Sequence, residues 1–262
     1  SHGMRNWATR AVGELAHRRD EINALNVFPV PDSDTGSNMA HTMEAAVAEL
    51  DNGGDVADSL ALGAVRGARG NSGMVLSQVL RGVAESTVDS VIDGAVFVRS
   101  LKQAVELVDR AIAEPVEGTV ITVLKAASES AEDAQAQSGA TLHSTVSAAI
   151  AAAETALERT PSQLPALREA GVVDAGGAGL VILLESLLAE IEGSTGHTGL
   201  SEPEPEIELE VVFFFEGDID TLQAAIEPLG DSLVIARATE DSANVHIHLS
   251  LIHISEPTRR TP

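Results

Sequence analysis

Two carboxylates, Asp32 and Asp34, lie one residue apart within residues 26–39, which read Asn-Val-Phe-Pro-Val-Pro-Asp-Ser-Asp-Thr-Gly-Ser-Asn-Met. Hard cations such as Mg²⁺ take oxygen ligands, and Mg²⁺ is usually held by one or two carboxylates together with substrate phosphates. A turn can aim both carboxylates at one point, whereas a helix would spread them about 100° apart around its axis for each residue. The stretch therefore predicts a magnesium site. The same residue types also make an ordinary turn and helix cap, and by itself this stretch leaves that alternative open.

Three glycine-containing segments, residues 67–73, 117–119 and 173–179, also precede predicted helices. Each would place backbone N–H groups at a helix N-terminus, where an anion binds well, and glycine lets the backbone approach a ligand closely. If these loops converge with the Asp32 loop at one end of a bundle, they form a phosphoryl-transfer site. None of them carries the Gly-Lys-Ser/Thr of a Walker A motif. Tight helix packing through glycine caps and spacers is the alternative for any one loop.

The acidic composition of the chain excludes some classes of binding partner. The chain of 262 residues carries 40 acidic and 16 basic residues, a formal charge of −24, so nucleic acid and anionic membranes would be repelled. A solvated acidic surface accounts for most of this excess, but an acidic protein that handles ATP must also screen the phosphates, which again indicates a metal ion. The absence of cysteine excludes a disulfide framework and a cysteine zinc site. We find no signal peptide or membrane-spanning run, and expect a cytoplasmic protein.

The elements that must position these loops are helices. Apolar residues recur at helical spacing, and before residue 200 the core must come from Ala, Leu, Val and Ile, which favours close helix packing. Glycine and proline breakers separate the helical patterns. The predicted helices cover roughly residues 5–22, 37–50, 56–66, 73–87, 96–113, 119–135, 141–159 and 175–192. We therefore expect an all-α domain of about eight helices over residues 1–193.

A second unit follows. Residues 194–206 have the composition of a linker, and residues 207–248 change to strand-like patterns at 207–215, 233–238 and 244–248, with a short helix at 222–229. This pattern is typical of an α/β or α+β unit. About 45 residues rarely bury an adequate core alone, so we expect the fragment to be incomplete.

The four motifs together, residues 26–39, 67–73, 117–122 and 173–180, resemble the nucleotide-binding domain of the dihydroxyacetone kinase L-subunit type. They resemble still more closely the ATP-binding subunit of bacterial fatty acid kinase. The likeness covers about residues 5–192 and continues into the next unit. It implies a barrel-like bundle of about eight amphipathic helices that binds ATP or ADP and Mg²⁺, as two ions, at one end.

The resemblance also implies roles for individual residues. Asp32 and Asp34 match the family's metal-binding, catalytic carboxylates. Asn26 stands where dihydroxyacetone kinases have a third aspartate, as it does in the fatty acid kinase branch, and would coordinate metal through its amide oxygen. Ser33 replaces the usual glycine between the aspartates. The nucleotide, its phosphates and the metal would be contacted by Thr35, Gly36, Ser37, Asn38, Asn71, Ser72, Gly73, Thr119, Asp174 and Gly176.

The implied reaction is transfer of the ATP γ-phosphoryl group to a fatty acid carboxylate, which gives an acyl phosphate. A separate lipid-carrying subunit of the DegV type would present the acyl chain. Positioning and charge neutralisation would do most of the catalysis, without a covalent enzyme intermediate. The family also suggests a homodimer.

In the family, a His-x-His of the following domain helps to bind zinc or serves catalysis, and His246 and His248 match it. On a strand these two side chains share one face. A cysteine often completes the family's site, but this chain has none, and Glu210 stands near that place. The sequence leaves open a Zn²⁺ site or two polar residues on an exposed strand face.

Residues 249–262 begin Leu-Ser-Leu-Ile-His-Ile-Ser-Glu-Pro-Thr-Arg, which is similar to the translation of a transposase-based sequencing-library adapter. The family resemblance stops at His248. We therefore expect this tail to be an artefact that truncates the gene, with a natural but unusual C-terminus as the alternative. His253 is accordingly left out of the predicted site.

Three other functions remain compatible with the sequence. A dihydroxyacetone kinase L-type subunit should carry the third aspartate in place of Asn26 and should end after the helical domain. A nucleotide-binding regulatory module would bind without turnover. A purely structural bundle would not bind nucleotide at all.

Overall fold

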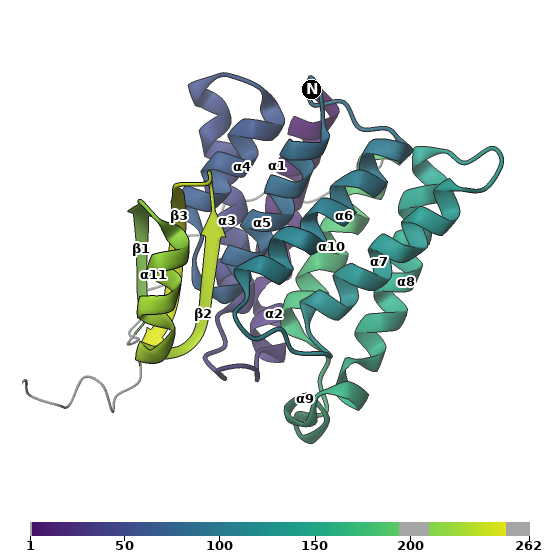
Figure 1. Cartoon of the computed structure of the whole chain (residues 1–262). Coiled ribbons are helices and arrows are strands. Elements are labelled where there is room, and N and C mark those ends of the chain that lie inside the picture. Colours follow the sequence, from purple (N-terminus) through teal and green to yellow (C-terminus); the bar gives the residue numbers. More distant parts are fainter. Residues whose placement is uncertain (1, 194–209, 250–262) are drawn as a thin grey trace, which may run out of the picture.

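The computed structural model describes residues 2–193 and 210–249 (Figure 1). The first range is helical and the second forms a small antiparallel sheet with one α-helix, so the predicted all-α bundle followed by an α/β fragment is confirmed. The predicted linker at 194–206 and residues 250–262 of the tail lie outside the described residues. The helices of the first range are α1 (His2–His17), α2 (Arg19–Leu25), α3 (Thr35–Glu49), η1 (Leu50–Asn52), α4 (Val56–Gly67), α5 (Gly70–Ser86), α6 (Gly94–Ala111), α7 (Val120–Gln135), α8 (Leu142–Gln163), α9 (Pro165–Ala170) and α10 (Ala175–Glu192).

The eight long helices contact one another in a closed ring. Its order is α1, α3, α4, α5, α6, α7, α8, α10 and back to α1. Short loops make successive helices run in opposite directions, so alternate members of the ring begin at the same end. The helices α3, α5, α7 and α10 are these alternate members, and they are the helices that follow the four motif loops.

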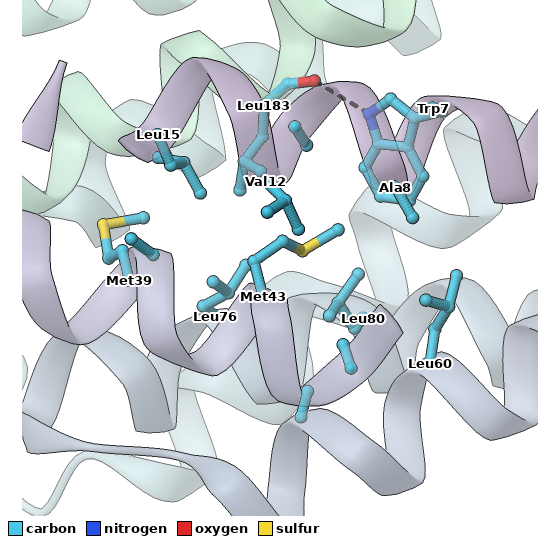
Figure 2. Close-up of a cluster of buried hydrophobic side chains, with 14 of the residues drawn as sticks. Trp7, Ala8, Val12, Leu15, Met39, Met43, Leu60, Leu76, Leu80 and Leu183 are labelled. Atoms are coloured by element: carbon cyan, nitrogen blue, oxygen red, sulfur yellow. Dashed lines mark hydrogen bonds between the residues drawn. The ribbon is translucent and has the colours of Figure 1, made fainter. Parts of the chain in front are cut away.

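Two apolar clusters fill the ring, and α10 belongs to both. Residues 180–184 of α10 are all buried, as expected where five consecutive apolar residues cover every side of a helix. In the first cluster, side chains of α1 face those of α3, α4 and α5, and Trp7 Nε1 donates to the Leu183 carbonyl oxygen at 3.1 Å (Figure 2). Close approach depends on small residues: a Cβ on Gly82 of α5 would lie 2.6 Å from the Ala104 backbone nitrogen of α6.

Two helix boundaries differ from the expectation. The predicted helix at 5–22 is two helices, because the chain turns at Arg18 and α2 then packs Ile22 against the first turn of α3. Pro161, expected to break a helix, lies inside α8. A proline cannot donate to the carbonyl one turn earlier, but the hydroxyl of Thr160 donates to that Leu157 oxygen at 2.7 Å and so satisfies it.

The second unit consists of β1 (Glu210–Glu216), α11 (Ile219–Ile226), η2 (Glu227–Leu229), β2 (Gly230–Arg237) and β3 (Ser242–Leu249). The strand order is β1-β3-β2 and both pairings are antiparallel. Alternate residues point to opposite faces of a strand. On β2, Leu233 and Ile235 join the cluster that contains Ile219 of α11, whereas Val234 and Ala236 pack against the helical ring.

The sheet therefore lies between α11 and the ring of helices (Figure 1). Ala68, Met74 and Ala111 of the ring complete the cluster that contains Val234 and Ala236. This shared core explains how a fragment of this size is buried: it uses the apolar surface of the neighbouring domain. Among residues 2–193 and 210–249, no helix combines the length and the apolar character needed to cross a membrane.

Candidate active site

A cavity of about 470 Å³ lies where α3, α5, α7 and α10 begin. This volume is within the range of small-molecule sites. Its polar wall combines residues from all four motif loops: Asn26, Asp32, Asp34, Thr35, Asn71, Ser72, Thr119 and Asp174, with Gly70 and Gly176. The rest of the lining is mainly apolar and consists of Phe28, Pro29, Val30, Val75, Ile112, Ala113, Val116, Val120, Ile121, Leu233 and Val234, together with Glu114 and Glu227. The structure thus brings the four loops together around one space.

Asn26 organises the loop that carries the two aspartates. Its side chain is buried, and its amide nitrogen donates to the Val30 carbonyl oxygen at 2.9 Å and to Asp32 Oδ1. Its amide oxygen accepts from the Thr35 hydroxyl. A carboxamide oxygen has two lone pairs. The bond from Thr35 uses one of them, so a metal ion would have to use the other. Asn26 is therefore foremost a scaffold for Asp32.

Asp34 is oriented from the start of α3. Asn38, one turn along that helix, donates from its amide nitrogen to Asp34 Oδ2 at 2.7 Å. Between the two aspartates, Ser33 has a φ of 59°, in the left-handed region that glycine adopts most easily. This backbone conformation gives a physical reason for the glycine that the family usually has at this position.

Gly70 joins the start of α5 to this arrangement. Its φ is +60°, and a Cβ there would lie 2.2 Å from Asn38 Nδ2. Both the backbone conformation and the close approach therefore require glycine. Any side chain at this position would displace the amide that orients Asp34.

Four of the predicted ligand-contacting residues do not line the cavity: Gly36, Ser37, Asn38 and Gly73. Ser37 turns toward α2, where its hydroxyl accepts from Asn23 Nδ2 at 3.0 Å and its backbone N–H donates to Asn23 Oδ1 at 3.0 Å. Gly36 and Gly73 are packing glycines: added Cβ atoms would lie 2.3 Å from the Arg19 carbonyl oxygen and 2.4 Å from Thr42 Oγ1. These residues support the site from behind.

Asp174 closes the cavity from the start of α10. It is buried, and it accepts from the Gly177 backbone N–H at 2.7 Å as the N-cap of that helix. Burial raises the pKa of this carboxyl from 3.8 to about 6, and hydrogen bonds from the backbones of Gly177 and Val120 partly oppose that rise. Thr119, the N-cap of α7, directs its hydroxyl to the Val116 carbonyl oxygen at 2.7 Å.

The charge of the cavity is one-sided. Five carboxylates line it, from Asp32, Asp34, Glu114, Asp174 and Glu227, and its described lining contains neither Lys nor Arg. Helix α5 begins there without a side-chain cap, and the N-cap side chain of α7 makes no capping bond, although the Val120 backbone N–H of α7 donates to the Asp174 carboxylate. Such helix starts favour an anion, but the carboxylates oppose it. An anionic ligand would therefore need a cation to enter with it.

The ligand types suit a hard cation. Asp32, Asp34 and Thr35 offer only oxygen atoms to the cavity, the donors that Mg²⁺ prefers. Within the described ranges, no group of three or more His, Cys, Asp and Glu side chains could hold a metal ion by itself. A magnesium ion at Asp32 and Asp34 would thus be completed by phosphate oxygens or water, as is usual for Mg²⁺.

His246 is buried rather than on an exposed strand face, and its Nδ1 lies 2.8 Å from Asn71 Oδ1 at the cavity. For His248, the structure defines the backbone position in β3, opposite Glu210 and Asp231. The side chains of His248 and Glu210 lie outside the described part of the structure, so a Zn²⁺ site that combines them with His246 stays a prediction.

The sequence did not reveal the apolar wall or its origin in two domains. Ile112 and Val116 come from the loop before α7, and Val234 comes from β2 and pairs with the backbone of Ile112. Apolar residues that line a cavity have the same local pattern as residues of the core. Only the proline and glycine punctuation of residues 115–118 marked that loop as unusual.

Comparison with known proteins gives a consistent family. The DAK2 domain matches residues 29–189. Protein YloV of Bacillus subtilis is 34% identical over an alignment of 268 positions, gaps included, which covers 89% of this chain and 48% of that protein. An uncharacterised protein of Staphylococcus saprophyticus is 37% identical over 187 residues, which cover 69% of this chain and 34% of that protein. The chain therefore spans about half the length or less of these relatives.

The fold is also that of a solved kinase domain. The dihydroxyacetone kinase of C. freundii in its native form matches with a TM-score of 0.53 at 20% identity, over 72% of this chain and 34% of that one. The same kinase in complex with AMP-PNP and Mg²⁺ matches with a TM-score of 0.52 at 22% identity, over the same shares of the two chains, 72% and 34%. At this level of identity the likeness concerns the fold.

Proposed function

We propose, on the premise that this chain belongs to the DAK2 domain family, that its cavity binds a magnesium nucleotide and supports phosphoryl transfer. One observation carries the proposal: four helix-opening loops meet at a single cavity that holds the Asp32 and Asp34 carboxylates. The C. freundii kinase with the same fold was solved with AMP-PNP and Mg²⁺, which agrees with this ligand class.

The charge of the cavity specifies how the nucleotide would bind. A polyphosphate brought next to five carboxylates, without Lys or Arg in the described lining, would be repelled. Mg²⁺ held by Asp32 and Asp34 would neutralise the phosphates, and this is the chemistry that the ion supplies when bound. Nucleotide binding should therefore depend on Mg²⁺ almost completely.

The remaining lining residues divide between the two ends of a nucleotide. Asn71 and Ser72, in the first turn of α5, offer polar side chains and helix-start N–H groups to phosphate oxygens. The apolar residues, among them Ile112, Val116 and Val234, offer a dry wall for a base. A cavity of about 470 Å³ holds one ligand of this size, so the phosphoryl acceptor would arrive from outside.

The acceptor that we propose is a fatty acid carboxylate presented by a separate lipid-carrying subunit of the DegV type. A carboxylate oxygen would attack the γ-phosphorus, the bond to the bridging oxygen would break, and ADP and an acyl phosphate would leave. Asn26 in place of a third aspartate and the α/β unit after the bundle support this branch over the dihydroxyacetone kinase type. Two Mg²⁺ ions and a homodimer remain predictions.

Calorimetric titration of ADP tests the nucleotide site. With Mg²⁺ present, we expect binding that disappears in EDTA and falls at least about a hundredfold in Asp32→Asn/Asp34→Asn, because the ligand phosphates lose their counter-charge. The double variant Asp51→Asn/Asp133→Asn is the control: it removes the same charge from two exposed positions and should bind normally.

Absence of binding by the folded, unmodified chain would overturn the proposal. An acyl-phosphate assay with a lipid-loaded carrier subunit then tests the reaction. Turnover of ATP with formation of acyl phosphate supports the fatty acid kinase assignment. Nucleotide binding without turnover indicates a non-catalytic nucleotide-binding module instead.

A further inference from the structure

His246 connects the second unit to the cavity. It is 0% exposed, and it lies in sheet register between Val212 of β1 and Val234 of β2. A buried imidazole is costly unless its nitrogen atoms are hydrogen-bonded. Its Nδ1 lies 2.8 Å from Oδ1 of Asn71, a residue 175 positions away in the sequence. The bond therefore joins two units that are distant along the chain.

The surrounding interface fixes this bond in space. Asn244 lies two residues before His246 on β3, so the two side chains share one face of the strand. Asn244 Nδ2 donates to the Val65 carbonyl oxygen of α4 at 2.7 Å, and the backbone of Val234 pairs with Ile112. The position of the imidazole is thus set by backbone pairing and by packing against the ring of helices.

Asn71 is the partner that matters for the ligand. It is the second residue of α5, it lines the cavity, and its Oδ1 lies 2.8 Å from His246 Nδ1. Because an amide oxygen can only accept, this contact assigns the proton to Nδ1 of His246. A carboxamide offers one acceptor oxygen and two N–H donors. Once the oxygen is engaged by His246, the orientation of the amide is fixed and its nitrogen is the group that it can offer to an anion.

We infer that His246 is a positioning residue: it holds the Asn71 amide so that its N–H donors face the phosphate end of a bound nucleotide. This inference rests on the proposed function of the cavity. It gives the second unit a role in nucleotide affinity, because His246 comes from β3 and the polar wall comes from the helical ring. With neither Lys nor Arg in the described lining, an oriented neutral donor carries more of the recognition.

The test measures Mg-ADP affinity of the full chain by calorimetry in a matched set of variants. His246→Leu fills the buried space without a donor and should weaken binding about three- to tenfold, the usual worth of one hydrogen bond. His246→Gln keeps an N–H donor and should restore most of the affinity. Asn71→Ala should weaken binding as much as His246→Leu, and the double variant should be no weaker than Asn71→Ala alone.

Asn244→Ala is the control for the interface. It removes the bond to Val65 without touching a lining residue, while the backbone pairing of His246 with Val212 and Val234 still holds the imidazole in place. The variant should therefore lower Tm but leave Mg-ADP affinity unchanged. As a spectroscopic signature, ¹⁵N NMR of the imidazoles should show His246 protonated at Nδ1, with that resonance shifted in Asn71→Ala. This readout tests the bond in the unmodified histidine, even if His246→Leu does not fold.

The outcomes separate the inference from the function. If the unmodified chain binds Mg-ADP and His246→Leu binds it equally well, only the positioning role is overturned. The same follows if the losses of affinity in His246→Leu and Asn71→Ala add up in the double variant. A His246 that is unprotonated at Nδ1 would also overturn it. Failure of the unmodified chain to bind Mg-ADP would overturn the proposed function, and the inference with it.

Discussion

The two ends of the helical ring treat the starts of their helices differently. At the end away from the cavity, α4, α6 and α8 are each capped by the side chain of their own N-cap residue, Asp55, Asp93 and Thr141. At the cavity end, the N-cap side chains of α3, α5 and α7 make no such bond, and only α10 is capped in this way, by Asp174.

The first turn of a helix leaves backbone N–H groups that a side chain, water or a ligand must satisfy. A side-chain cap contributes about 1 kcal/mol. At the cavity end, side chains from other elements replace part of it: Asn23 Oδ1 accepts from the Ser37 N–H of α3, and the Asp174 carboxylate accepts from the Val120 N–H of α7, so the cost in stability falls mainly on α5.

Backbone conformation does not separate the two ends, because the cavity end has Ser33 and Gly70 at positive φ and the loop before α6 has Asp89 and Ser90. The difference lies in the helix starts: one end closes them with local caps, and the other leaves the start of α5 available to a ligand.

The largest expected effect on stability at the cavity end comes from Asp174, the buried N-cap of α10, and it tests the contrast between the two ends of the ring. Raising its pKa from 3.8 to about 6 corresponds to about 3 kcal/mol. Because the folded state holds this proton more tightly than the unfolded state, the ionised carboxylate destabilises the fold. The penalty is absent below about pH 3.8, grows between pH 3.8 and about 6, and is complete above that.

Asp174→Asn keeps a capping side chain and removes this penalty. The free energy of unfolding of the variant minus that of the unmodified chain should rise across that pH window, by up to about 3 kcal/mol at neutral pH. Urea unfolding at a series of pH values measures it, and taking the difference cancels the other carboxylates that titrate in both proteins. A difference that stays flat with pH would show that Asp174 is not the buried cap with a raised pKa described above.

Gly70→Ala should break the cavity end with a smaller loss of stability, about 2 kcal/mol. The left-handed backbone costs an alanine about 1 kcal/mol or more, and its Cβ would displace the Asn38 amide that orients Asp34. We therefore expect a lower Tm together with weaker Mg-ADP binding.

Gly139→Ala provides the matched comparison. Gly139 has a φ of +81°, but it lies in the exposed loop before α8 and nothing lies within 4 Å of an added Cβ. This variant should lose only the backbone term, about 1 kcal/mol, with unchanged nucleotide affinity. Equal effects of the two substitutions on affinity would contradict the role assigned to Gly70.

The sequence predicted the contrast only in part, and the reasons are physical. Helical periodicity and glycine breakers predicted the helices, and an up-and-down ring then makes the loops before alternate helices meet. The sequence did not predict the directions in which individual side chains point. Ser37 and Asn71 both follow a glycine at a helix start, yet Ser37 turns to Asn23 and Asn71 lines the cavity. Which way a side chain points depends on packing partners that are distant in the sequence.

The same limitation applies to the second unit. Its strands were predicted from β-branched and aromatic residues, but no local signal indicates that Val234 would line the cavity or that His246 would reach Asn71. Burial of His246 follows from the docking of the sheet on α4 to α6. The family motif drew attention to this histidine as a zinc ligand, whereas the observed contact is with a residue of the cavity wall.

The smallest expected effects compare one residue from each end directly. Asp93 Oδ1 accepts from the Val96 backbone N–H at 2.8 Å, so Asp93→Ala should cost about 1 kcal/mol in unfolding free energy and leave Mg-ADP affinity unchanged. Ser72 lines the cavity in the first turn of α5, and Ser72→Ala should change stability by less than about 0.5 kcal/mol, because alanine is the better helix former. Its nucleotide affinity should nevertheless fall a few-fold.

Urea unfolding and calorimetry on the same two proteins measure both quantities. Finding that Asp93→Ala weakens binding, or that Ser72→Ala destabilises the fold without affecting binding, would show that the two ends do not divide stability and ligand binding between them.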